Sequence, residues 1–155
     1  MSKLTVVENK KLVLKHVVCH ELRNISLDVL DDKINQFVAQ LQVLNVQSFG
    51  PLITKAFGSS MDDKGNITVN YDVMVQAHNY KNYKDMYKTY ERLTEEHCVY
   101  LRFEDHPQYI NFAHNKLDLY FYEHDLMAKD ITYTIIVEDG QDHLVMDLFR
   151  PERKL

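Results

Sequence analysis

The spacing of apolar residues switches between two periods, and this switch occurs twice along the chain. Residues 12–25 alternate in a pattern that predicts a strand. In residues 27–44 the apolar positions recur at three- and four-residue steps, which predicts an amphipathic helix. Strands are predicted over 52–57 and 67–75, and the loop at 62–66 has the Gly expected in a hairpin. The first half therefore has the order strand, helix, strand, strand.

The second half repeats this order. Strands are predicted over 97–105, 131–138 and 144–149, and a helix over 109–125. An offset of about 81 positions carries the first half onto the second, although few residues are identical. We interpret this pattern as an internal duplication. It predicts an α+β fold in which two strand–helix–strand–strand units form a shared antiparallel sheet, with the helices on one side.

A length of 155 residues, 45% of them hydrophobic, fits a single domain. We expect repeat 1 over 12–78, a linker over 79–96 and repeat 2 over 97–151. Four tyrosines of the linker fall at helical spacing, which predicts a connecting helix. Their rings either pack on the body of the protein, cover a pocket or form a surface for a partner protein. These tyrosines are Tyr80, Tyr83, Tyr87 and Tyr90.

The charge and cysteine content exclude several classes of function. A formal net charge of −5 argues against nucleic acid as a partner, because there is no basic excess to neutralise phosphates. No apolar stretch is long enough for a membrane span, and the N-terminus does not resemble a signal peptide. With only Cys19 and Cys98, the chain has too few cysteines for a disulfide framework, so we expect a cytoplasmic protein.

Motifs for catalysis or metal binding are not recognisable in the sequence. The eight histidines form no HExxH pattern, there is no Cys-x-x-Cys pair, and no Gly-rich loop is suited to phosphate. Neither cysteine has the flanking His and acid of a nucleophilic triad. The sequence therefore predicts no metal, no cofactor, no catalytic residue and no enzymatic activity.

A candidate ligand site follows from the predicted sheet face that points away from the helices. Aromatic rings beside carboxylates on a concave surface favour a lipophilic cation, through charge attraction and stacking on ring faces. An alternative is that Glu21–Arg23 and Arg102–Glu104 are ordinary ion pairs on a solvated sheet face. The candidate residues are Glu21, Tyr100, Glu104, Tyr109, Tyr133, Asp147 and Phe149.

Three short motifs resemble those of the gyrase-inhibitor-like (GyrI-like) domains. Gly50-Pro51-Leu52-Ile53 resembles the family's Gly-Pro step from the first helix into the second strand. The segment 102–109 resembles its His-x-Gly-x-Tyr turn, with Pro107 at the Gly position and Tyr109 at the Tyr position. The closing segment 147–151 resembles its last strand. These domains bind effectors in bacterial multidrug-sensing regulators and are related to the SOUL haem-binding proteins.

Because no helix-turn-helix precedes the domain, the resemblance implies a stand-alone, ligand-binding member. The chain also resembles small Gram-positive proteins of this fold. The expected ligand is a lipophilic cation held in the groove between the repeats. Many relatives carry a Glu two residues before the aromatic residue equivalent to Tyr133, where this chain has Ile131. The resemblance also leaves open a non-catalytic, type VII secretion-associated interaction protein, and a small hydrolase that would use Glu104 and Tyr109.

Overall fold

The computed structural model describes residues 4–154, and these divide into two compact units. Unit 2 is continuous and comprises residues 14–93. Unit 1 is built from two stretches, residues 4–13 and 94–154. Each unit contains antiparallel strands and one α-helix, so the predicted α+β class with strand–helix–strand–strand order is confirmed.

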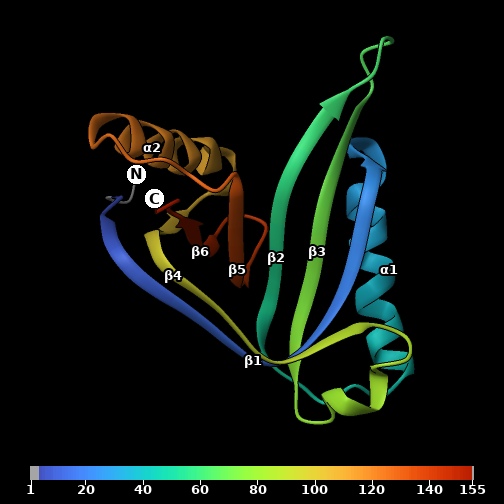
Figure 1. Cartoon of the computed structure of the whole chain (residues 1–155). Helices are drawn as coiled ribbons and strands as arrows, with labels where there is room; N and C mark the ends of the chain where they lie inside the picture. The colour runs from blue at the N-terminus through green and yellow to red at the C-terminus, as the bar shows by residue number, and fades with distance from the viewer. Residues whose placement is uncertain (1–3, 155) are drawn as a thin grey trace. The chain divides into compact units, whose positions relative to one another are not determined.

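Unit 2 contains most of β1 (Val6–Ser26), together with α1 (Leu30–Val43), β2 (Ser48–Met61) and β3 (Ile67–Ala77). A 3-10 turn, Leu27–Val29, leads into α1. The strands pair antiparallel in the order β1–β3–β2, and α1 runs along this sheet (Figure 1). Phe37 and Leu41 of α1 pack with Val18, Leu22 and Val73 in the core of the unit.

Unit 1 contains most of β4 (Lys88–Asp105), together with α2 (Ile110–Glu123), β5 (Ile131–Asp139) and β6 (Leu144–Pro151). The strands pair antiparallel in the order β4–β6–β5. Alternate residues of β4 and β6 pack with Ala113, Leu117 and Phe121 of α2, so the predicted helix-facing sides of these strands are confirmed. The strand residues in this core are Val99, Leu101, Phe103, Leu144, Met146 and Leu148.

Both helices end in the same hydrogen-bond motif. At the end of α1, Asn45 has a φ of +58°, and its N–H donates to the Gln42 carbonyl while the Val46 N–H donates to the Leu41 carbonyl. This is the Schellman arrangement, and Asp125 repeats it after α2 with a φ of +53°. The helix therefore ends before Gly50-Pro51, which does not terminate it. Gly50, with a φ of +73°, lies inside β2, where the pairing with β3 shifts register.

The predicted helix over 79–96 is also wrong. Residues Tyr80–Tyr83 form a short 3-10 helix, and β4 begins at Lys88. Tyr80, Tyr83 and Tyr87 are each less than 10% exposed and belong to the core of unit 2. The hydroxyl of Tyr83 donates to the Leu44 carbonyl at 2.9 Å. The four tyrosines therefore do not form the exposed stripe that a partner protein would need.

Candidate functional site

Three aromatic residues form a row across the sheet of unit 1. Phe149 of β6 lies directly opposite Tyr100 of β4 on one side and Tyr133 of β5 on the other. Directly opposed residues of antiparallel strands share a face, so the three rings lie on the side away from α2. The Tyr100 and Phe149 ring centroids are 4.9 Å apart. Tyr133 and Phe149 are buried, whereas Tyr100 is half-buried.

A carboxylate lies beside this row. Asp147 is opposite Arg102, which donates from Nε and Nη2 to its two carboxylate oxygens at 2.8 and 3.0 Å. The Tyr100 hydroxyl donates to Asp147 Oδ1 at 2.7 Å. Burial acts to raise the pKa of Asp147, but the hydrogen bonds from Arg102 and Tyr100 outweigh it, so the pKa lies below its usual value. Burial and the bond to Asp147 raise the pKa of Tyr100 to about 12, so this residue acts as a donor at neutral pH.

A cation of the chain itself contacts the Tyr100 ring. Lys10 Nζ is 5.6 Å from the ring centroid, within the range of a cation–π contact. Since the hydroxyl of the same ring is bonded to Asp147, Tyr100 presents its face to one charge and its polar tip to the opposite charge. The aromatic–carboxylate cluster, defined as Tyr100, Phe149, Tyr133 and Asp147, thus has a ring face that accepts a cation.

A second carboxylate of unit 1 was missed in the sequence. Glu95 Oε1 accepts a hydrogen bond from the Tyr133 hydroxyl at 3.2 Å, and Glu95 Oε2 is 3.3 Å from Lys129 Nζ. The side chain of Glu95 is only 17% exposed. Because Glu95 lies in a charged stretch, the sequence pattern does not predict that its side chain is mostly shielded from solvent. Glu95 therefore provides an acidic group beside Tyr133. The acid that the resemblance leads us to expect at position 131 is replaced by Ile131.

The other predicted site residues lie elsewhere. Tyr109 packs against the α2 side of unit 1 and stacks on Phe112. Glu104 is exposed, and its Oε1 lies 3.6 Å from His143 Nε2. Glu21 belongs to unit 2 and pairs with Arg23. Glu104 and Tyr109 therefore do not form the acid–aromatic pair that was expected for a small hydrolase.

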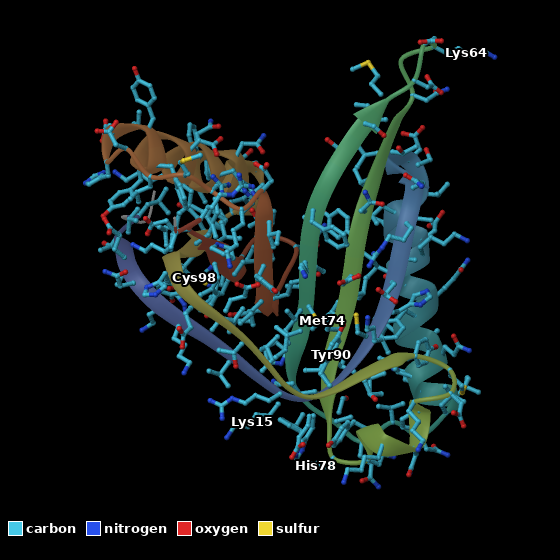
Figure 2. All side chains as sticks on the ribbon, in the orientation of Figure 1. Lys15, Lys64, Met74, His78, Tyr90 and Cys98 are labelled. Carbon is cyan, nitrogen blue, oxygen red and sulfur yellow. The ribbon has the colours of Figure 1, made fainter. Side chains whose placement is uncertain are left out.

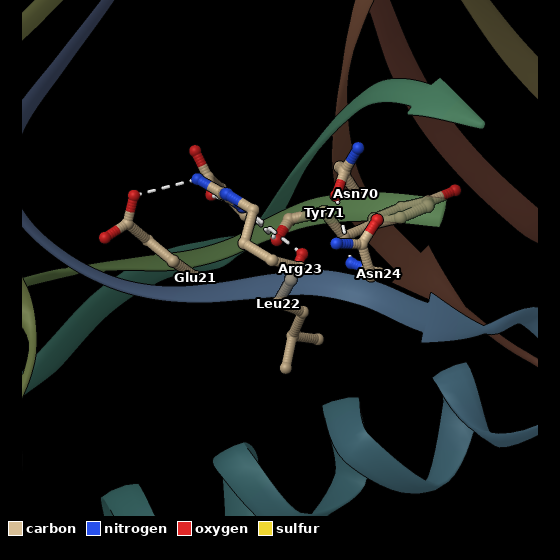
Figure 3. A network of polar contacts seen from close by, with 7 residues as sticks. Glu21, Leu22, Arg23, Asn24, Asn70 and Tyr71 are labelled. Atoms are coloured by element: carbon tan, nitrogen blue, oxygen red, sulfur yellow. Dashed lines mark hydrogen bonds and ion pairs between the residues drawn. The ribbon is translucent and has the colours of Figure 1, made fainter. Parts of the chain in front are cut away.

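Unit 2 has a matching row with different chemistry. Met74 of β3 lies opposite Cys19 of β1 and Ile53 of β2, as Phe149 lies opposite Tyr100 and Tyr133 (Figure 2 labels Met74). Two residues further along these strands, Glu21 lies opposite Asp72 (Figure 3 labels Glu21). In unit 1 the equivalent pair is Arg102 and Asp147. The aromatic surface is thus a property of unit 1, whereas each unit has an aspartate at the centre of its sheet.

Neither cysteine is suited to nucleophilic catalysis. Cys19 and Cys98 are free and buried. Burial, with a smaller contribution from Asp72, raises the pKa of Cys19 to about 12, and burial raises that of Cys98 to about 11. Both thiols are therefore protonated at neutral pH, and the thiolate is the reactive form. Among residues 4–154 no three His, Cys, Asp or Glu side chains are placed to hold a metal ion.

Comparison with known proteins identifies the fold. No family model matches the sequence, and neither does any curated protein. A solved structure of SAV2435 bound to tetraphenylphosphonium is 7% identical, with 98% of this chain and 94% of that chain covered and a TM-score of 0.57. An uncharacterized conserved protein from Listeria innocua is 10% identical, covers 97% and 92%, and has a TM-score of 0.57. Likeness at such identities establishes a shared fold.

Two further similar structures correct one prediction. A hydrolase encoded by lin2189 and a second hydrolase, both from Listeria innocua, are each 8% identical, cover 97% of this chain and 92% of theirs, and have TM-scores of 0.53 and 0.54. The prediction that this chain is not an enzyme is therefore wrong as an inference from missing motifs, because proteins named hydrolases share its fold.

In the part of the chain that the structure describes, no helix has the length and apolar character needed to cross a membrane.

The pKa of Asp147 predicts how this cluster responds to acid. A carboxyl whose pKa is lower in the folded protein stabilises the fold above its unfolded pKa of about 3.9, and this stabilisation is lost as the pH falls through the folded pKa. We therefore expect Asp147→Asn to reduce the urea midpoint relative to wild type at pH 7, and by progressively less as the pH is lowered below about 4. A reduction that does not change with pH would contradict the assignment.

Proposed function

We propose that this chain is a GyrI-like effector-binding domain that binds a lipophilic cation at the aromatic–carboxylate cluster of unit 1. The observation that carries this proposal is the double role of Tyr100, whose ring accepts Lys10 while its hydroxyl donates to Asp147. A lipophilic cation would replace Lys10 at the ring and be attracted by the Asp147 carboxylate. The binding of tetraphenylphosphonium by SAV2435, which shares the fold, supports this class of ligand.

The strength of binding depends on the positive groups already present. Arg102 forms a bidentate pair with Asp147, and Lys10 lies at the Tyr100 ring, so these three groups together carry one more positive than negative charge. A small hydrated cation gains little from such a site. A large apolar cation loses little hydration free energy on binding, and contact with the aromatic ring adds to its affinity. The site should therefore prefer bulky aromatic cations to ammonium ions.

The proposal is tested by isothermal titration calorimetry with tetraphenylphosphonium at pH 7. We expect Asp147→Asn to weaken binding at least tenfold, because the charge is lost while the shape of the side chain is kept. The matched control is Glu104→Gln, which removes an exposed carboxylate from the same face and should change affinity less than twofold. Equal effects of the two substitutions, or no binding by wild type, would overturn the proposal.

A further inference from the structure

The outer face of α2 carries large apolar side chains. Phe112, Leu119 and Tyr122 are 49%, 51% and 82% exposed. They follow one another at steps of seven and three residues, so they share one side of the helix. Leu117 and Phe121, which pack in the core of unit 1, lie on the opposite side. We call the three exposed residues the apolar stripe of α2.

The corresponding helix of unit 2 has no such stripe. α1 and α2 each contain 14 residues, and an offset of 80 positions carries one onto the other. The buried Leu117 then corresponds to Phe37, which is also buried. The stripe positions correspond to Asp32, Ala39 and Gln42, which are all exposed. The two helices therefore share the character of their inner face, whereas the apolar outer face is specific to α2.

Two opposite charges lie beside the stripe. Lys116 and Glu123 are exposed, and neither forms an ion pair within residues 4–154. They are seven residues apart, which places both on the same flank of the stripe. If two copies of α2 run antiparallel about a twofold axis at the level of Leu119, each Lys116 lies opposite Glu123 of the partner subunit. The stripe and its charges are therefore complementary to a second copy of themselves.

We propose that the apolar stripe of α2 is the interface of a homodimer in which two α2 helices pack antiparallel. Leu119 packs on Leu119 of the partner subunit at the axis, and Tyr122 covers this contact. A helix of about 21 Å buries less than the roughly 800 Å² per partner of a standard interface, so the dimer is reversible. The aromatic–carboxylate cluster lies on the other side of the sheet of unit 1, so this interface does not depend on the function proposed above.

The experiment is sedimentation velocity of the full chain at pH 7, at concentrations from about 10 μM to about 1 mM, because an interface of this size binds more weakly than a standard one. Wild type should pass from monomer to dimer over this range. We expect Leu119→Asp to weaken dimerisation at least tenfold, because it places two carboxylates together at the axis. Ala39→Asp introduces the same charge at the equivalent exposed position of α1 and should change the dissociation constant less than twofold. A monomer at the highest concentration, or equal effects of the two substitutions, would overturn the proposal.

Reversal of the flanking charges tests the antiparallel direction. Lys116→Glu and Glu123→Lys should each weaken dimerisation at least tenfold, because each turns two attractive contacts into repulsive ones. The variant with both substitutions exchanges the charges and should return to within threefold of wild type. If the double variant is as weak as the single ones, the two residues do not face each other and the proposed dimer is wrong.

Cross-linking provides a readout that does not depend on affinity. Cys19 and Cys98 are buried, so Leu119→Cys adds an accessible thiol at the proposed axis. Under mild oxidation it should form an intermolecular disulfide at least tenfold faster than Ala39→Cys, whose thiol is exposed on α1. Equal rates for the two variants would show that the disulfide forms by random collision, and would refute the interface.

Discussion

Phe37→Ala is expected to lower the free energy of unfolding by about 3–5 kcal/mol, the usual cost of removing a buried aromatic ring. Phe37 is 2% exposed and projects from α1 into the core of unit 2. Its ring stacks on His20 at 5.4 Å and meets the edge of Tyr87 at 5.3 Å. Alanine would leave a cavity beside His20 and Tyr87, which the surrounding side chains would fill only in part. Urea unfolding followed by circular dichroism measures the loss.

The matched control lies on the same helix. Val43 is 80% exposed, so Val43→Ala removes methyl groups without opening a cavity. We expect this substitution to change stability by no more than about 0.5 kcal/mol. If both variants lost similar stability, the burial of Phe37 would not account for its loss, and the assignment of Phe37 to the core would be wrong.

Tyr133→Ala, in unit 1, is expected to lower the free energy of unfolding by about 3–5 kcal/mol. The Tyr133 side chain is 1% exposed and lies opposite Phe149 in the aromatic row. Its hydroxyl also donates to Glu95. The substitution removes both the ring and the hydrogen bond, and urea unfolding at pH 7 gives the sum.

Tyr133→Phe separates these two contributions. It keeps the ring and removes the hydroxyl that donates to Glu95, which retains Lys129 as a partner. We expect the free energy of unfolding to fall by about 1.5–3 kcal/mol, the usual contribution of a hydrogen bond to a charged acceptor. A loss as large as that of Tyr133→Ala would show that the hydroxyl, not ring packing, holds this part of the sheet together.

Periodicity predicted the elements whose apolar residues all face one neighbour. Val99, Leu101 and Phe103 alternate in the sequence and pack on the α2 side as expected. The same rule failed for the tyrosines of residues 80–90. Their three- and four-residue spacing predicts a helix, but the 3-10 helix ends at Tyr83 and β4 begins at Lys88. Tyr83 and Tyr87 are instead held by hydroxyl bonds to Leu44 and Gln40, distant partners that spacing does not reveal.

The candidate site shows a similar division. Tyr100, Asp147 and Phe149 were selected from strand alternation, and the structure brings them into contact. Asp72 was not predicted as a site residue, because in the sequence it is an ordinary polar residue of an alternating strand. In the structure it lies opposite Glu21, and Arg23, beside a bulge of β1, donates to its carboxylate. Pairing register and bulges depend on two strands at once, so one strand's sequence does not specify them.

The order of the two units along the chain also governs how the protein is made. Unit 2 is continuous, so its core can close once residue 93 has left the ribosome. Its β2–β3 hairpin has a short turn in which Asp62 accepts hydrogen bonds from Lys64 and Asn66, and such local contacts form early. Unit 1 needs Val6 to meet a core that extends to Leu148. Val6 is therefore synthesised before unit 2, but it can contact this core only after Leu148 has been made.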